Sequence, residues 1–159
     1  MTWICRPATA ADAGDLAVMV TALAALHGDR ATVTPEALRA YGFGPRPRFH
    51  AIVAEGPDGL IGYAICYIIF NAQTASVVAD LHHLYVVADH RQAGVGRALV
   101  AGVVDWAEAE GCHRLRVGVA PDNRRAADFY RRLGMREKAP NFLADQGDFP
   151  RLRSHCRQG

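Results

Sequence analysis

Along the first quarter of the chain, apolar residues follow a strand-like spacing and then a helical one. Residues 3–6 are mostly apolar and stop at Pro7, which predicts a first strand. Thr9 and Asp12 have the spacing of a capping box, a polar signal that opens a helix. Behind them, apolar residues recur on one helical face until Gly28, namely Leu16, Met19, Val20, Leu23 and Leu26. The pattern predicts a strand followed by an amphipathic helix.

A shorter helix and three strands are predicted next. Thr34 as N-cap and Pro35 in the first turn mark the start of the helix, which fades near Gly42. Runs rich in apolar, β-branched and aromatic residues then predict strands at 49–55, 60–70 and 75–87. The connections 56–59 and 71–74 are short and polar, so we expect antiparallel hairpins.

Beyond residue 88 the pattern changes to helix, strand, helix. A helix is predicted from Val95 to about residue 110, and Gly111 ends it. Residues 115–119 alternate as a strand, and residues 126–133 have helical spacing. The tail, 135–159, has a weak pattern that allows one or two further strands.

This order of elements predicts an α/β (α+β) domain with a mixed sheet. Its first half is hairpin-like, and a βαβ unit spans residues 80–119. We expect about six or seven strands and about four helices, with residues 1–159 forming one domain. Half of the residues are apolar, which is enough for a core without a metal or disulfide.

Composition narrows the possible environments and partners. Charged residues make up 21% and the net charge is only +2, which gives no case for a nucleic acid or a membrane as partner. The start of the chain lacks the features of a signal peptide, and the longest apolar run, 64–70, is too short to cross a bilayer. We therefore expect a cytoplasmic protein, with a solvated tail that carries Arg151, Arg153 and Arg157.

The four cysteines, by their spacing, predict neither a metal site nor a redox motif. They lie far apart and form no Cys-x-x-Cys pair. We expect them to be free thiols, either buried or at the surface, in a reducing compartment. They are Cys5, Cys66, Cys112 and Cys156.

Between residues 84 and 99, a predicted strand runs into a short loop that opens a helix. Gly94 and Gly96 have no side chains to block an approaching ligand. The unpaired N–H groups at the start of the helix, together with the helix dipole, would form a pocket for pyrophosphate. Arg91 and Arg97 add mobile positive charge.

Two better-known phosphate-binding motifs do not fit this loop. A Rossmann fingerprint needs glycine or alanine where this chain has Leu99, and a P-loop needs a Gly-Lys-Ser/Thr run that is absent. Taken alone, the two glycines are also explained by a tight turn between strand and helix. A second motif decides between these readings.

Two linked motifs resemble the GNAT superfamily of N-acetyltransferases. The run Arg91-x-x-Gly94-x-Gly96 matches the family's acetyl-CoA signature. Residues 123–135 resemble its Asn-x-x-Ala-x-x-Phe-Tyr-x-x-x-Gly-Phe motif, with methionine at the last position. The resemblance is strong over residues 80–136. It implies a GNAT-like three-layer fold and acetyl-CoA as cosubstrate, with no metal.

The resemblance also assigns residues to the cofactor. The strand before the loop would open at a bulge, and backbone groups of Leu84 and Val86 would pair with the pantetheine arm. A main-chain N–H there would polarise the thioester carbonyl, in the manner of an oxyanion hole. Asn123 would bind near the pantetheine. The expected cofactor-binding residues are Leu84, Tyr85, Val86, Arg91, Gln92, Ala93, Gly94, Val95, Gly96, Arg97, Asn123 and Tyr130.

Tyr130 is the expected catalytic acid. Coenzyme A leaves as a thiolate, and a phenol within reach can protonate its sulfur. The alternative is that Tyr130 is a core aromatic, since it has helical spacing with Phe129 and Leu133. The match to the family motif favours the catalytic role.

The general base is expected on the strand before the loop. Family members with a glutamate base place it at positions that match Asp80 or His82. Strand alternation puts these two side chains on one face with Leu84, and places His83 on the other. A neutral imidazole or a carboxyl with a raised pKa is competent as a base. His82 could equally be a binding residue, and His83 is expected to be structural.

These observations predict an enzyme that acetylates a primary amine by direct attack through a tetrahedral intermediate. The acceptor is expected to be a small molecule, such as a polyamine, an amino acid or an amino sugar. A protein amine and a non-catalytic acetyl-CoA-binding module are the alternatives. Acceptor identity should depend on residues 23–45, the hairpin at 70–80 and the tail, none of which has a motif. A homodimer is possible because dimers are common in the family.

Overall fold

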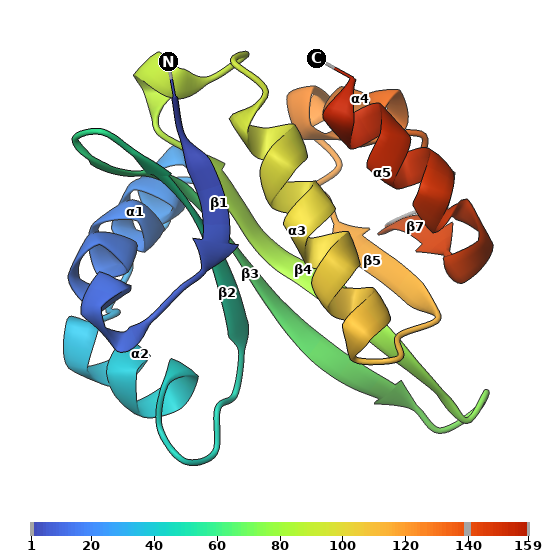
Figure 1. Ribbon diagram of the computed structural model, residues 1–159, viewed down its shortest axis with the longest axis horizontal. Helices are drawn as coiled ribbons and strands as arrows, with labels where there is room; N and C mark the ends of the chain where they lie inside the picture. The colour runs from blue at the N-terminus through green and yellow to red at the C-terminus, as the bar shows by residue number, and fades with distance from the viewer. Residues whose placement is uncertain (1, 139–140, 159) are drawn as a thin grey trace.

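A mixed sheet of seven strands forms the centre of the molecule, in the order β1-β2-β3-β4-β5-β7-β6 (Figure 1). The computed structural model describes residues 2–138 and 141–158. The expected tail strands include residues 139 and 140, which lie outside the described residues, as do residues 1 and 159 at the ends of the expected domain. The strands are β1 (Ile4–Pro7), β2 (His50–Gly56), β3 (Gly59–Asn71), β4 (Ser76–Val86), β5 (Arg114–Gly118), β6 (Arg136–Lys138) and β7 (Asn141–Asp145).

Strand direction confirms the predicted mixed α/β fold. β1 to β4 pair as antiparallel neighbours, as expected of hairpins with short polar connections. β4 and β5 are parallel because α3 connects them, and β7 pairs antiparallel with both β5 and β6. The change of direction at β4 and β5 lies in the middle of the sheet, where the candidate site is found.

Helices cover both faces of the sheet and enclose two apolar cores (Figure 1). One core lies between the sheet and α1 with α2, and includes Leu16, Val53 and Tyr63. The larger core lies between the sheet and the remaining helices, and includes Leu99 and Tyr130. The helices are α1 (Ala13–Leu26), α2 (Pro35–Gly42), α3 (Val95–Ala109), α4 (Arg124–Arg132) and α5 (Phe149–Arg157). None of the helices in the described residues is long and apolar enough to cross a bilayer.

The helix starts follow the polar signals in the sequence, with one difference. Thr34 caps α2 as predicted, since its hydroxyl oxygen accepts a hydrogen bond from the Ala37 N–H at 3.1 Å. The capping box of Thr9 and Asp12 instead opens a single 3-10 turn, and α1 starts after it. Arg6 pairs with Asp12 at 2.8 Å, and this hydrogen bond holds the pKa of the Asp12 carboxyl at about 2.

The tail differs most from the prediction. Strands β6 and β7 are present, but residues after 148 form helix α5, which raises the number of helices in the described residues to five. Phe149, Leu152 and Cys156 recur at helical spacing and are buried in the larger core. Arg153 was expected to be solvated, yet its guanidinium binds Asp105 and Glu108 of α3. The tail is therefore a packed layer of the fold.

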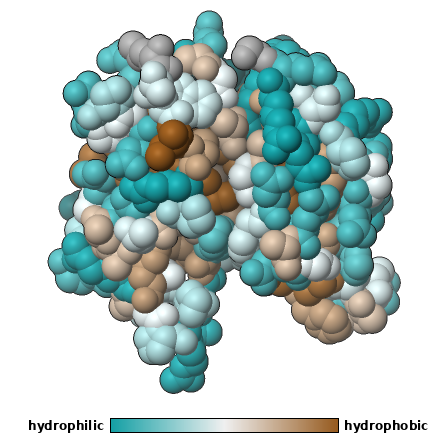
Figure 2. All heavy atoms as spheres, in the orientation of Figure 1, coloured by the Kyte–Doolittle hydropathy of each residue, from teal (hydrophilic) through white to brown (hydrophobic). Residues whose placement is uncertain are grey.

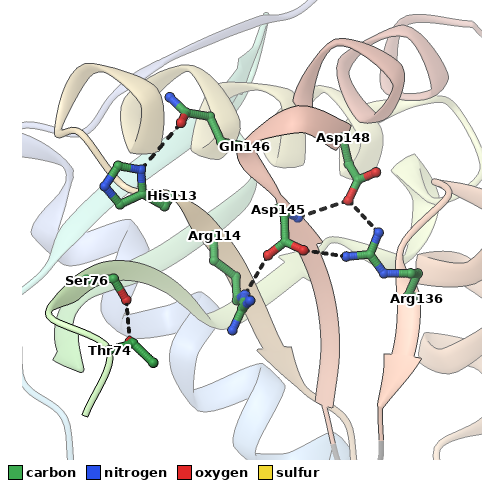
Figure 3. Close-up of polar contacts among 8 residues, drawn as sticks. All are labelled: Thr74, Ser76, His113, Arg114, Arg136, Asp145, Gln146 and Asp148. Carbon is green, nitrogen blue, oxygen red and sulfur yellow. Dashed lines mark hydrogen bonds and ion pairs between the residues drawn. The ribbon is translucent and has the colours of Figure 1, made fainter. Parts of the chain in front are cut away.

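Ion pairs join the last strands to the start of α5 (Figure 3). The Asp145 carboxylate accepts hydrogen bonds from Arg114 on β5 and Arg136 on β6, each at 2.7 Å. Arg136 also binds Asp148 at 2.7 Å, just before α5. These exposed pairs fix the register of three strands more than they add stability, because exposed ion pairs contribute about 0–1 kcal/mol each.

The hairpin of β3 and β4 extends beyond the neighbouring strands (Figure 1). Its end carries the exposed apolar side chains of Ile68 and Phe70, and apolar atoms gather on this projection in the space-filling view (Figure 2).

No disulfide bond links the four cysteines. Cys5, Cys66, Cys112 and Cys156 are all free thiols.

Candidate active site

A cleft of about 1460 Å³ opens where β4 and β5 separate. The two strands pair from Val78 opposite Arg114 to Leu81 opposite Val117, and beyond Leu81 the strand β4 continues to pair with β3 on its other side. The lining comes from β4, the end of β5 with the loop after it, the loop before α3 with the first turn of α3, the helix α4, and the end of α1. Because α1 and α4 cover opposite faces of the sheet, the cleft passes between the separated strands from one face to the other.

A β-bulge in β4 lies on the wall of this cleft. Ile65 of β3 pairs with His83 and Cys66 pairs with Leu81, so His82 is the extra residue of the bulge. The bulge reverses the alternation of side chains after it. Leu81 and Leu84 therefore both face the larger core.

The predicted side-chain alternation on this strand was wrong for that reason. Asp80 lies opposite Tyr67, which packs on the core under α1 and α2, and His83 contacts Tyr63 of the same core. Asp80 and His83 therefore share a face, and Leu84 lies on the other one. A resemblance to the family implied the bulge, but period-two spacing placed these side chains as if it were absent.

Backbone groups of β4 face the open gap. Val87 donates its N–H to the Ile61 carbonyl of β3 at 2.9 Å, so the N–H and C=O groups of Leu84 and Val86 point to the opposite side. In the described residues, pairing with β5 has ended before this point. The Val86 carbonyl oxygen accepts a hydrogen bond from Arg91 Nε at 2.8 Å. The Leu84 backbone is thus available to an extended ligand.

The start of α3 presents a group of backbone donors to the cleft. Gly94 is the N-cap, with φ at 86°, and Gln92 also has a positive φ of 66°. The first hydrogen bond of the helix runs from the Ala98 N–H to the Gly94 carbonyl at 3.1 Å. The N–H groups just before Ala98 therefore have no partner within the helix. Together with the helix dipole, they suit a pyrophosphate.

The two arginines of this loop are held in place, which corrects the expectation of mobile charge. Arg91 bonds to the Val86 carbonyl, and its guanidinium lies 5.6 Å from the centre of the Tyr85 ring. Arg97 donates to the carbonyl of Gln158 after α5. Each guanidinium contributes charge to the cleft from a fixed position.

Two further arginines, which were not predicted from the sequence, line the cleft. Arg125 and Arg132 lie on α4 and face the cleft. Their spacing of seven residues places them on one helical face, and that spacing was the available signal. Within the described part of the chain, neither forms an ion pair. Both add positive charge to the lining of the cleft.

The Tyr130 hydroxyl opens into the cleft although most of its side chain is buried. Tyr130 is 5% exposed and packs against the rings of Phe129 and Phe142. Burial raises the pKa of the Tyr130 phenol above its ordinary value. Among the described residues, the Tyr130 hydroxyl has no hydrogen-bond partner. Every buried polar side-chain atom in these residues does have a partner. Tyr130 is one of the residues that line the cleft, and burial favours its protonated form.

Asn123 lines the cleft and also caps α4. Its side-chain oxygen accepts a hydrogen bond from the Ala126 N–H at 3.1 Å. This contact leaves the amide NH₂ group as the part of the side chain that can reach a ligand. The sequence motif therefore includes a helix cap as well as an expected cofactor contact.

Two histidines of the bulge lie on the wall of the cleft, while Asp80 does not. The rings of His82 and His83 stack with centroids 4.6 Å apart, and His83 Nδ1 lies 3.2 Å from the Tyr63 hydroxyl. Burial, with smaller effects from His82 and His27, lowers the pKa of His83 to about 4. Asp80 is 9% exposed and bound to Arg116 at 2.6 Å.

Residues 2–138 and 141–158 contain no group of His, Cys, Asp or Glu that could hold a metal ion.

Comparisons with known proteins agree with this arrangement. The model of the acetyltransferase (GNAT) family matches residues 20–135. The chain is 34% identical over 142 residues to the thialysine N-epsilon-acetyltransferase of Sus scrofa, and the match covers 83% of each chain.

This chain belongs to the GNAT family. It is therefore an acyltransferase, an acetyl-CoA-dependent N-acetyltransferase. The fold agrees with solved members. A structure of Arabidopsis thaliana NAA60 with a bisubstrate analogue has a TM-score of 0.73 at 17% identity, covering 91% of this chain and 98% of the other. An aminoglycoside acetyltransferase from an uncultured soil sample has a TM-score of 0.70 at 17% identity, covering 81% and 85%.

Proposed function

We propose that the chain acetylates the primary amine of a small molecule, with acetyl-CoA bound in the cleft between β4 and β5. One observation carries this proposal: the Tyr130 hydroxyl, the open β4 edge and the unpaired N–H groups of α3 all line the same cleft. Phosphate groups would meet the α3 donors and the pantetheine would pair with Leu84. The thioester would then lie near Tyr130.

The proposed reaction is a direct attack of the amine on the thioester carbonyl. A carbon–nitrogen bond forms, negative charge develops on the carbonyl oxygen, and a main-chain N–H of β4 stabilises it. When the tetrahedral intermediate collapses, the carbon–sulfur bond breaks and Tyr130 donates its proton to the thiolate. Burial favours the protonated form of the phenol, which is the form that this step requires. Solvent in the cleft then returns a proton to Tyr130.

His82 is the better candidate than Asp80 for the base that accepts the amine proton. His82 is the exposed residue of the bulge and lines the cleft. Asp80 is not one of the described residues that line the cleft. Its carboxylate accepts two short contacts from the Arg116 guanidinium. The Asp80 carboxylate therefore binds a guanidinium and does not reach an amine in the cleft.

The acceptor is proposed to be a flexible amine of the lysine side-chain type. The Sus scrofa relative is named for thialysine, and the match extends over most of both chains. Asp29, which follows α1, lines the same cleft and supplies a carboxylate for a cationic acceptor. Backbone carbonyls at the end of α1 would favour such a cation as well.

Thiol release from acetyl-CoA, measured with a panel of amines, tests this proposal. The panel includes thialysine, lysine, an aliphatic diamine and an amino sugar, and the proteins are the wild type, His82→Gln and His113→Gln. His113 is an exposed histidine outside the cleft, so His113→Gln is the matched control. We expect turnover with thialysine and lysine, and a fall in kcat of about 100-fold or more for His82→Gln alone.

Two results would contradict the proposal. Wild-type activity in His82→Gln would exclude His82 as the base. Binding of acetyl-CoA without thiol release from any amine of the panel would favour the alternative of a non-catalytic binding module.

A further inference from the structure

Two consecutive histidine rings stack in the cleft, an arrangement that a regular strand does not allow. Neighbouring side chains of a strand point to opposite faces, but the bulge brings the rings of His82 and His83 to 4.6 Å and within 16° of parallel. His82 is exposed, while His83 is half-buried and faces the core under α1. The two imidazoles therefore share one site in different environments.

His83 is connected to a fully buried phenol. The Tyr63 side chain is 0% exposed, and its hydroxyl lies 3.2 Å from His83 Nδ1. Among the described residues this is the hydroxyl's one hydrogen bond to a side chain. A buried O–H group needs an acceptor, and the unprotonated Nδ1 of a neutral imidazole is one. Burial also raises the pKa of Tyr63, so the phenol keeps its proton as a donor.

The direction of this hydrogen bond decides which nitrogen of His83 carries the proton. If Tyr63 donates to Nδ1, a neutral His83 must carry its proton on Nε2. Protonating Nδ1 as well would place two hydrogens between the same two atoms and leave the buried O–H without an acceptor. The lowered pKa of His83, which burial causes first, agrees with a neutral ring.

We propose that Tyr63 is a positioning residue that fixes His83 in its neutral Nε2–H form, so that His83 donates a hydrogen bond to an oxygen atom of the acceptor and His82 is the proton acceptor of the pair. The inference rests on the proposed acetyl transfer in this cleft. His83 faces the α1 side of the sheet, and Tyr130 belongs to the core on the other side. The proposed mechanism places the sulfur of the cofactor near Tyr130, on one face of the sheet. The acceptor therefore approaches from the opposite face, where the histidines lie.

A neutral His83 also favours proton transfer to His82. When His82 takes the amine proton, its ring becomes positive next to the stacked ring of His83. A second charge at 4.6 Å would oppose this step, whereas a neutral ring does not. His27 at the end of α1 also acts on His83, and its charge lowers the pKa of His83 as that of His82 does.

The first test observes the tautomer itself. Nitrogen-15 spectra of the histidine side chains at pH 7 separate protonated from unprotonated ring nitrogens. We expect His83 to carry its proton on Nε2 in the wild type, and to lose this single form in Tyr63→Phe. A proton on Nδ1 of wild-type His83, or an unchanged tautomer in Tyr63→Phe, overturns the proposal. This readout needs no turnover, so it is distinguishable from failure of the proposed activity.

The second test compares two amides that differ in reach. The side-chain nitrogen of glutamine extends about as far as Nε2, and that of asparagine only as far as Nδ1. We expect His83→Gln to keep the acceptor KM near the wild-type value, and His83→Asn to raise it about tenfold or more, with kcat less affected in both. At position 82 neither amide should restore kcat, because neither is a base. Equal kinetics of the two variants at position 83, or rescue of kcat by His82→Gln, overturns the assignment.

Discussion

The backbone conformation of Gly94 can be tested by one methyl group. Gly94 is the N-cap of α3 with φ at 86°, in the left-handed region, and an added Cβ would meet no atom within 4 Å. Gly14, near the start of α1, also has open space around an added Cβ but lies within a right-handed helix. Both substitutions therefore add a methyl group in open space, but only Gly94→Ala places it on left-handed backbone.

The two variants should change stability in opposite directions. An alanine in the left-handed region costs about 1–2 kcal/mol, and the lower entropy of the unfolded chain returns about 0.4–1 kcal/mol. Gly94→Ala should therefore lower the free energy of unfolding by about 1 kcal/mol. Gly14→Ala introduces no such strain. It should raise the free energy of unfolding by about 0.5–1 kcal/mol, because alanine favours the helix.

Thermal unfolding without ligand measures the difference. For a domain of this size, 1 kcal/mol corresponds to about 2–4 °C in Tm, so the two variants should differ by about 3–8 °C in total. Urea unfolding with an unchanged m-value would show that neither substitution changes the compactness of the unfolded chain. If Gly94→Ala raised Tm as Gly14→Ala does, the left-handed N-cap would be wrong, and so would the donor arrangement derived from it.

Two further predictions concern the tail and acid stability. Phe149 is fully buried where α5 meets the core, so Phe149→Ala should lower the free energy of unfolding by about 3–5 kcal/mol in urea titrations; a loss below about 1 kcal/mol would mean that α5 does not pack there. The pKa of His83 is about 4 in the folded protein and ordinarily 6.5, so between these two pH values the unfolded chain binds more protons than the folded one. Stability should be intact above pH 6.5 and fall by about 2–3 kcal/mol by pH 4, and a smaller fall in His83→Gln would confirm the source. Below pH 3.8, protonation of Asp12 should remove a further contribution as the pH approaches 2.

The sequence predicted the parts of the fold that depend on local spacing. Apolar periodicity located the elements up to α4, and Thr34 with Pro35 fixed the start of α2. The two family motifs selected the α3 loop and the Tyr130 face of α4, which the fold brings into one cleft. These segments were predictable because neighbouring residues in the chain determine them.

What the sequence did not predict depends on long-range contacts. Helix α5 is stabilised by burial of Phe149 and by the ion pairs of Arg153 with α3, which the tail's own pattern does not reveal. The family resemblance implied a bulge in this strand, but no glycine marks its position at His82, so alternation placed Asp80 and Leu84 on one face. The contact between Tyr63 and His83 joins residues twenty positions apart and follows from strand register.

The most direct test of the proposed mechanism is the acetyl-transfer rate of Tyr130→Phe. The substitution removes one oxygen that has no hydrogen-bond partner in the described residues, so Tm should change by no more than about 2 °C. Thiol release is measured under single-turnover conditions with saturating acetyl-CoA and thialysine, beside the wild type. The proposed mechanism predicts a rate lower by about 100- to 10,000-fold, with acetyl-CoA affinity nearly unchanged. A rate within about threefold of the wild type would contradict the role of Tyr130 as the acid.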